Sequence, residues 1–210
     1  MLSADDRPAL ADIAPALRRA VSLDPRSLVR LRLGDERAVA LVRLPFDVLV
    51  ARTVPARRRD PIDVTVGVGA VLAWLDDETG TPPAPCDEQW HSARPPDHGW
   101  RRIETVPDHD LRPLVQGGAR TLREAAEREG VPGAQPRAEV ADALLDSVVL
   151  TVSDGERSAE VTLRALSALV RMAFLPRGGR VHVDVAGRWV RVVAEYGTVF
   201  LERGSPLALA

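Results

Sequence analysis

The chain has 210 residues, of which 45% are hydrophobic and 28% charged, and its formal net charge is −2. These proportions exclude a disordered, collagenous or coiled-coil chain and are typical of a globular protein long enough to bury a core. All 28 basic residues are arginine, which we interpret as the mark of a GC-rich bacterial genome, and they are spread among 30 acidic residues. The sequence therefore lacks the basic region that nucleic acid binding requires.

The first third of the chain predicts one helix followed by antiparallel strands. Residues 3–21 have apolar residues at helical spacing, although Pro15 is expected to break this helix into two pieces. Residues 28–33 and 38–43 alternate between apolar and polar side chains on either side of a Gly-Asp-Glu turn, which predicts a hairpin. Residues 48–54 are expected to form a short strand or helix, and a further strand is expected at 62–66.

Residues 78–118 differ in composition from the rest of the chain. They contain seven of the seventeen prolines, two of the four tryptophans and three of the four histidines. This composition predicts a long irregular segment that connects two parts of the protein.

The last part of the chain predicts further helices and antiparallel strands. Helices are expected at 119–129, ending at Gly130, and at 137–146, followed by a second hairpin over 148–161. An amphipathic helix is expected at 163–174, with Arg164, Ser167 and Arg171 on its polar side and Val170 on its apolar side. A meander of three strands is expected at 181–185, 189–193 and 198–202. We therefore predict an α+β fold in which antiparallel hairpins and a meander pack against helices.

The two predicted hairpins superpose without a gap when the sequence is shifted by 119 residues. Val29 then falls on Val148, and Asp35 falls on Asp154 within the turn. Because a slip of one residue would turn a strand inside out, the shared alternation of apolar residues favours two pseudo-symmetric α-β-β-x-β repeats. The alternative is that two amphipathic hairpins in a valine-rich chain match by coincidence.

This hypothesis divides the chain into three parts. The first repeat would span 1–77 and the second 119–205, with 78–118 as the Pro/Trp/His-rich connection. All three parts are expected to form a single compact unit over residues 1–210, because the length suits one large domain.

Five side chains between residues 86 and 109 are the candidates for chemistry, because their types serve in nucleophilic, acid–base and zinc sites. Their spacing matches no zinc-binding motif, and the sequence around the cysteine contains no recognisable nucleophile turn. We therefore expect no metal, no cofactor and no catalytic activity; the alternative is a small hydrolase or metal-dependent enzyme that uses these residues. They are Cys86, Asp87, His91, His98 and His109.

Two tryptophans and two arginines are the candidates for binding. Trp90 and Trp100 predict an aromatic contact surface, because tryptophan is enriched at binding hot spots; the alternative is that both rings fasten a long loop to the core. Arg52 and Arg171 coincide under the 119-residue shift and either flank a shared groove or pair with neighbouring acids. The partner is expected to be another protein or a small ligand rather than nucleic acid or a membrane.

The sequence also indicates a cytoplasmic protein. Cys86 is the only cysteine, so no internal disulfide is expected. The N-terminus has acids where a signal peptide has positive charge. The longest nearly apolar run, 64–75, is too short to cross a bilayer.

Overall fold

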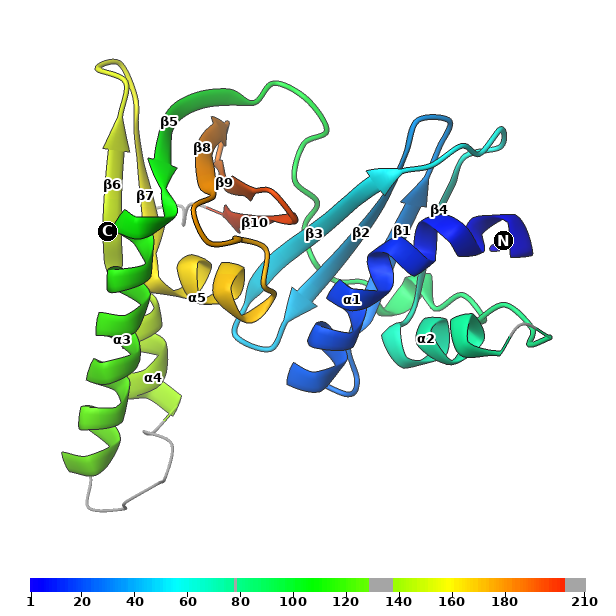
Figure 1. Cartoon of the computed structure of the whole chain (residues 1–210), viewed down its shortest axis with the longest axis horizontal. Coiled ribbons are helices and arrows are strands. Elements are labelled where there is room, and N and C mark those ends of the chain that lie inside the picture. The colour runs from blue at the N-terminus through cyan, green and yellow to red at the C-terminus, as the bar shows by residue number, and fades with distance from the viewer. Residues whose placement is uncertain (78, 129–137, 203–210) are drawn as a thin grey trace, which may run out of the picture. The chain divides into compact units, whose positions relative to one another are not determined.

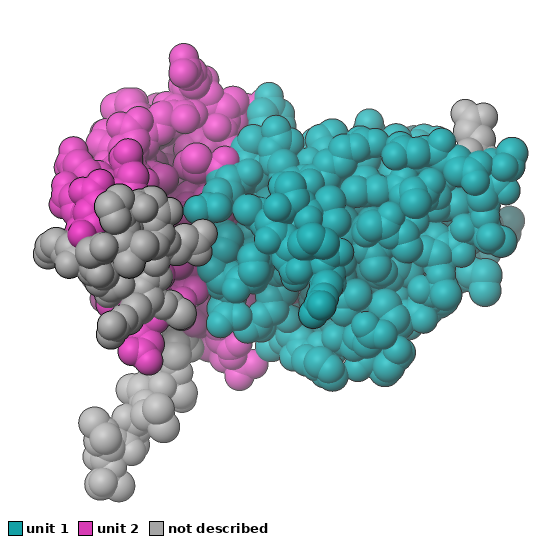
Figure 2. Space-filling model, turned by 90° about the horizontal axis from the view of Figure 1, so that it is seen from below, with its two compact units in different colours: residues 1–94, 171–173, 196–198 teal, residues 95–170, 174–195, 199–210 magenta. Residues whose placement is uncertain are grey.

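The computed structural model of the chain describes residues 1–77, 79–128 and 138–202. These residues form two compact units (Figure 2). Unit 1 contains residues 1–94 together with 171–173 and 196–198, and unit 2 contains the rest. The boundary between the units, at Arg94 and Pro95, falls inside the segment that was expected to be a connection.

Unit 1 is an antiparallel sheet with two helices (Figure 1). Its strand order is β4-β1-β2-β3. Val29 on β1 lies opposite Val42 on β2 and opposite Val66 on β4. β1 therefore lies between β2, its partner in the predicted hairpin, and β4. The elements are the short helix η1 (Ala4–Asp6), α1 (Arg7–Leu23), β1 (Leu28–Leu33), β2 (Arg37–Leu44), β3 (Val48–Pro55), β4 (Ile62–Gly67), α2 (Val68–Asp76) and the short helix η2 (Asp87–Gln89).

The core of unit 1 lies between this sheet and α1. Leu10, Ile13 and Leu17 repeat at helical spacing, and all three are buried. Leu31 on β1 is buried on the inner face of the sheet. The expected break at Pro15 is wrong, because α1 continues through this residue. Pro15 lies on the exposed side of the helix, where water can satisfy the carbonyl group that loses its amide partner.

Unit 2 contains two antiparallel sheets and three helices. One sheet has the order β10-β9-β8-β5, and β6 and β7 form the predicted second hairpin. The predicted meander is confirmed as β8, β9 and β10. The elements are β5 (Arg101–Pro107), α3 (Asp108–Arg128), α4 (Ala138–Leu145), β6 (Val148–Ser153), β7 (Ser158–Thr162), α5 (Leu163–Arg171), β8 (Arg180–Ala186), β9 (Trp189–Ala194) and β10 (Gly197–Glu202).

The expectation of an irregular segment over 78–118 is wrong for its second half. Residues 101–107 form a strand, and α3 starts at Asp108, about ten residues before the expected start. Apolar residues at 103 and 106 are buried, and their contribution outweighs the local proline content. The expected helix end at Gly130 lies outside the described residues.

The α+β fold class is confirmed, with antiparallel hairpins and a meander packed with helices. The two stretches related by the 119-residue shift share the order helix, hairpin, third element, strand. Their third elements differ, because β3 is a strand and α5 a helix. Their strand pairing also differs, since β4 pairs with β1 whereas β8 pairs with β5 and β9. The superposition therefore holds for the order of elements and not for sheet topology.

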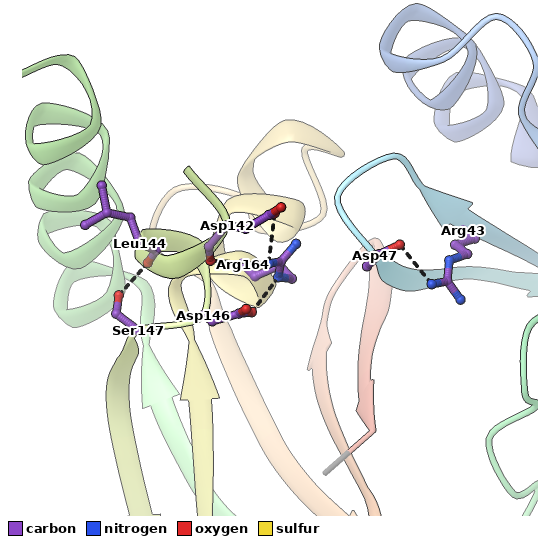
Figure 3. A network of polar contacts seen from close by, with 7 residues as sticks. All are labelled: Arg43, Asp47, Asp142, Leu144, Asp146, Ser147 and Arg164. Atoms are coloured by element: carbon purple, nitrogen blue, oxygen red, sulfur yellow. Dashed lines mark hydrogen bonds and ion pairs between the residues drawn. The ribbon is translucent and has the colours of Figure 1, made fainter. Parts of the chain in front are cut away.

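The expected polar and apolar sides of α5 are wrong at two residues, Arg164 and Val170. Arg164 is 7% exposed, and its guanidinium bonds the carboxylates of Asp146 at 2.8 Å and Asp142 at 3.2 Å (Figure 3). Val170, expected on the apolar side, is 42% exposed. Burial of Arg164 is tolerated because both carboxylates match its charge.

No helix in the described part of the chain is both long and apolar enough to cross a membrane.

Candidate functional site

A pocket of about 450 Å³ lies in unit 1, where three chain segments meet. The first is the connection from α1 to β1, the second is the turn from β2 to β3, and the third follows η2. The lining residues are Asp24, Arg26, Ser27, Leu28, Arg43, Leu44, Pro45, Asp47, Gln89, Trp90, His91 and Ser92.

The β2–β3 turn holds a strained residue at the wall of this pocket. Asp47 has a φ of +59°. This is the left-handed backbone conformation, which a residue other than glycine adopts at a cost in free energy. Its carboxylate accepts a hydrogen bond from Arg43 at 2.8 Å (Figure 3). Arg43 also reaches the hydroxyl of Ser92 at 3.4 Å, so the turn is connected to the third segment.

The third segment is held against the sheet by its backbone and side chains. The amide of Cys86 donates to the carbonyl of Thr65 on β4 at 2.8 Å, and the Thr65 amide donates to the carboxylate of Asp87 at 2.6 Å. Arg94 pairs with Asp63 of β4 at 3.1 Å. These contacts place Trp90 and His91 at the pocket.

The charges that line the pocket nearly cancel. Arg43 forms an ion pair with Asp47, and the carboxylate of Asp24 accepts a hydrogen bond from the backbone amide of Arg26. Trp90 is half-buried, while its indole nitrogen is buried and has no hydrogen-bond partner among the residues that the structure describes. A pocket with an aromatic wall and balanced charge suits a partly apolar ligand better than a phosphate or another strong anion.

The candidate residues of the hydrolase alternative are divided between the two units. Burial, followed by the charges of Glu88 and Asp87, raises the pKa of the Cys86 thiol, which keeps it protonated and a poor nucleophile. His91 is in unit 1, whereas His98 and His109 are in unit 2 and exposed. Across the described ranges, no three histidine, cysteine or acidic side chains form a group that would hold a metal ion.

The two predicted binding tryptophans lie in different units. Trp100 of unit 2 stacks against Arg191, whose guanidinium carbon is 4.3 Å from the ring centroid, and contacts the ring of Phe200 at 5.8 Å. Its indole nitrogen donates to the carbonyl of Pro96 at 2.8 Å. Arg191 in turn bonds the buried carboxylate of Asp184 at 2.9 Å. These contacts support the alternative in which Trp100 fastens its segment to the sheet.

The two predicted binding arginines both rest on aromatic rings. The guanidinium carbon of Arg52 lies 5.8 Å from the ring centroid of Tyr196, and that of Arg171 lies 5.9 Å from Phe46. The two residues are far apart in the sequence but both are grouped with unit 1. Neither lines the pocket around Trp90.

Sequence reasoning identified two lining residues of the pocket, Trp90 and His91, and missed the rest. The strained turn had a signal in the sequence, because aspartate adopts the left-handed region more readily than most residues and here follows Pro-Phe. The convergence of the α1–β1 connection with this turn depends on strand pairing and leaves no local pattern.

Several solved bacterial structures have the same fold at very low sequence identity. The DNA polymerase III subunit beta of Pseudomonas aeruginosa has a TM-score of 0.57 and 12% identity, covering 93% of this chain and 62% of that one. The DNA polymerase sliding clamp of Caulobacter crescentus has a TM-score of 0.56 and 14% identity, covering 96% and 65%. The Helicobacter pylori beta clamp, solved with carprofen, has a TM-score of 0.52 and 10% identity, covering 94% and 63%.

The chain thus spans less than two thirds of the length of these clamps, and the likeness shows the fold alone. A search of curated proteins gave no match. Residues 1–92 match the family described as "Domain of unknown function (DUF8010)". The model of a second family covers residues 95–206, more than half of the chain, and the chain therefore belongs to the family described as "Domain of unknown function (DUF8185)".

Proposed function

We propose that this chain is a non-catalytic scaffold that binds a protein partner through the unit 1 pocket around Trp90. The observation that carries the proposal is this pocket of about 450 Å³, which combines a half-buried tryptophan, a strained turn and balanced charge. Pockets of this size and character receive one or two side chains of a bound segment.

The fold supports a scaffold rather than an enzyme. The similar structures are sliding clamps, which are subunits of a larger assembly, and a scaffold of this kind acts by binding. The hydrolase alternative needs a nucleophile, a base and an orienting group in contact. Among the described residues, no three histidine, cysteine or acidic side chains form a group that would hold a metal ion, and the raised pKa of the Cys86 thiol works against a cysteine nucleophile.

The experiment that tests the proposal compares partner capture by three forms of the tagged full chain. The wild-type chain is expected to co-purify one protein in stoichiometric amount from its native cells. Trp90→Ala removes the aromatic wall and should weaken the purified complex by about 2 kcal/mol, roughly thirtyfold in Kd. Tyr196→Ala is the matched control, because it removes an aromatic ring that is 43% exposed and lies outside the pocket.

Equal binding by Trp90→Ala and the wild-type chain would contradict the proposal. So would a wild-type chain that retains no protein but binds a small molecule in the same pocket. Circular dichroism of each variant, recorded before capture, separates a loss of binding from a loss of folding.

A further inference from the structure

The outer edge of β4 is covered by residues 86–94, which we call the edge cover. β4 pairs with β1 along one side only. On the other side, the Thr65 amide donates to the Asp87 carboxylate at 2.6 Å, and the Thr65 carbonyl accepts from the Cys86 amide at 2.8 Å. A residue of a neighbouring antiparallel strand would make the same two bonds with its own backbone.

The edge cover imitates a strand at one residue only. Beyond Thr65 it is held by side chains, through Arg94 to Asp63 at 3.1 Å and through Ser92 to Arg43 at 3.4 Å. Arg94 is 52% exposed, so water screens its ion pair and weakens it. A true strand would add backbone bonds on either side of Thr65, which this attachment does not make.

Two polar groups, one on β4 and one in the edge cover, are buried without a hydrogen-bond partner among the described residues. Thr65 is fully buried, and its hydroxyl has no hydrogen-bond partner in the described part of the chain. The indole nitrogen of Trp90, within the cover itself, is buried without a partner as well. Such groups raise the free energy of the state that buries them, and opening the cover would let water or a ligand satisfy both.

We infer that the edge cover is displaceable and that the exposed edge of β4 accepts an extended segment of a protein partner as an added strand. The inference rests on the proposed function, because it names how that partner binds. Strand addition to a sheet edge is a general mode of peptide recognition in which backbone bonds supply affinity. Since Trp90 and His91 lie in the cover and line the pocket, displacement at β4 also changes the pocket.

Amide hydrogen exchange of the full chain tests whether the cover opens. Val64 and Val66 alternate with Thr65 along β4, so their backbone groups face β1. In the wild-type chain the Thr65 amide is expected to exchange at least about tenfold faster than these two, through opening of the cover alone. Equal exchange at all three positions would mean that only unfolding of the strand exposes Thr65, and would overturn the inference.

A matched pair of variants locates the cause of protection. Asp87→Ala removes the acceptor of the Thr65 amide and should speed its exchange by about tenfold. Glu88→Ala removes the adjacent carboxylate, which has no bond to β4 among the described contacts, and should leave the rate unchanged. Unchanged exchange at Thr65 in Asp87→Ala would overturn the inference.

A synthetic peptide tests whether the edge accepts a strand. The probe has the sequence of residues 28–33, which already forms an antiparallel ladder with the opposite side of β4. Fluorescence anisotropy should show about tenfold tighter binding to Asp87→Ala than to the wild-type chain or to Glu88→Ala, and bound peptide should restore protection at Thr65. A peptide with alternate prolines is the control, since it cannot form the ladder.

The outcomes separate this inference from the proposed function. If Trp90→Ala loses the protein partner while the peptide leaves Thr65 unprotected, the proposed function stands and the strand-addition inference falls. If the peptide protects Thr65 while Trp90→Ala retains the partner, the edge site stands and the pocket is not where the partner binds.

Discussion

At the scale of single residues, Trp90 and Trp100, the two tryptophans within residues 78–118, have different surroundings. Trp90 lines a pocket and has an unsatisfied indole nitrogen, whereas Trp100 has a hydrogen bond, a cation and a second ring around it. The contacts of Trp100 support a structural role, and the incomplete contacts of Trp90 support its proposed role in binding a partner.

Trp100→Ala is expected to destabilise unit 2 by about 2 kcal/mol, because the stack with Arg191 and the contact with Phe200 are both lost. Urea denaturation followed by circular dichroism measures the change. Trp100→Phe keeps a ring in place and should lose about half as much. An unfolding midpoint equal to that of the wild-type chain would contradict the structural role of this residue.

Arg164→Ala should lower the free energy of unfolding by about 1–2 kcal/mol. Burial works against the charge of Arg164, but the carboxylates of Asp146 and Asp142 outweigh it and raise the pKa of the guanidinium. The loss stays moderate because both carboxylates are more than half exposed and can be hydrated. Arg180→Ala, at an exposed position, is the control for the same denaturation measurement.

The sequence indicated which residues could bind or be buried, but not which residues they would contact. It placed Arg164 on a solvent face, because periodicity treats every arginine as polar. Two aspartates compensate its charge: Asp142, on α4 and 22 residues away, and Asp146, just after α4 and 18 residues away. Only the packed structure brings them to Arg164. The pocket residues Arg43 and Asp47 were missed for a related reason, since their role follows from a turn conformation.

At the scale of elements, the close approach of α3 to α5 depends on one glycine. A Cβ atom on Gly118 would lie 2.4 Å from a methyl carbon of Leu163, the first residue of α5. Gly117, its neighbour on α3, has nothing within 4 Å of the equivalent position. Substitution by alanine is therefore expected to lower stability at Gly118 and to raise it at Gly117.

Gly118→Ala is expected to destabilise the protein by about 1–3 kcal/mol, because buried Leu163 has little room to move. Gly117→Ala should raise stability by about 0.5–1 kcal/mol through helix propensity alone. Thermal unfolding of the two variants side by side measures both changes. A stabilised Gly118→Ala variant would show that α3 and α5 do not pack as described.

Asp108, the first residue of α3, predicts an acid-sensitive attachment of this helix. The hydrogen bond from Arg112 at 2.6 Å lowers the pKa of this carboxyl below its ordinary value of 3.8. A lowered pKa in the folded state stabilises the protein above pH 4 and loses that contribution as the pH falls through the folded value. Asp108→Asn should therefore be less stable than the wild-type chain at pH 7.

The difference between Asp108→Asn and the wild-type chain should shrink as the pH falls below about 4 and through the lowered pKa of Asp108. Denaturation midpoints measured from pH 7 to pH 2 test this dependence. A difference that stays constant over the whole range would show that the carboxylate charge makes no contribution.

The hairpins and the meander were predictable because alternation of period two is a local signal that pairing then confirms. β5 was not, because its residues stand beside prolines and its pairing partner, β8, lies about eighty residues away. The likeness of element order between the two halves was visible in the sequence. The difference in pairing was not, because it depends on which strand each edge meets.

At the scale of the whole molecule, the balance of charge extends to the helices. The five α-helices of residues 1–77, 79–128 and 138–202 contain nine arginines and eight acidic residues in total. Affinity for a phosphate backbone depends on the number of cations that replace counterions. The near-equal numbers of arginines and acidic residues in the helices therefore favour weak binding to duplex DNA.

A labelled duplex of about 20 base pairs is expected to bind more weakly than about 100 µM at physiological salt. Fluorescence anisotropy over a range of salt concentrations measures this affinity. Micromolar binding that falls steeply with added salt would instead place nucleic acid among the partners of the chain.

The covered edge of β4 has a consequence for synthesis of the chain on the ribosome. Residues 62–67 emerge about twenty residues before Cys86 and Asp87, which corresponds to roughly one to four seconds at usual elongation rates. During that interval the strand has an open edge that another nascent chain could extend. Pro61 at its entrance and Asp63, paired with Arg30 at 2.6 Å, are residues that oppose such edge-to-edge association. Pro61 and Asp63 therefore limit association at the edge of β4 until residues 86–94 have been synthesised and can cover it.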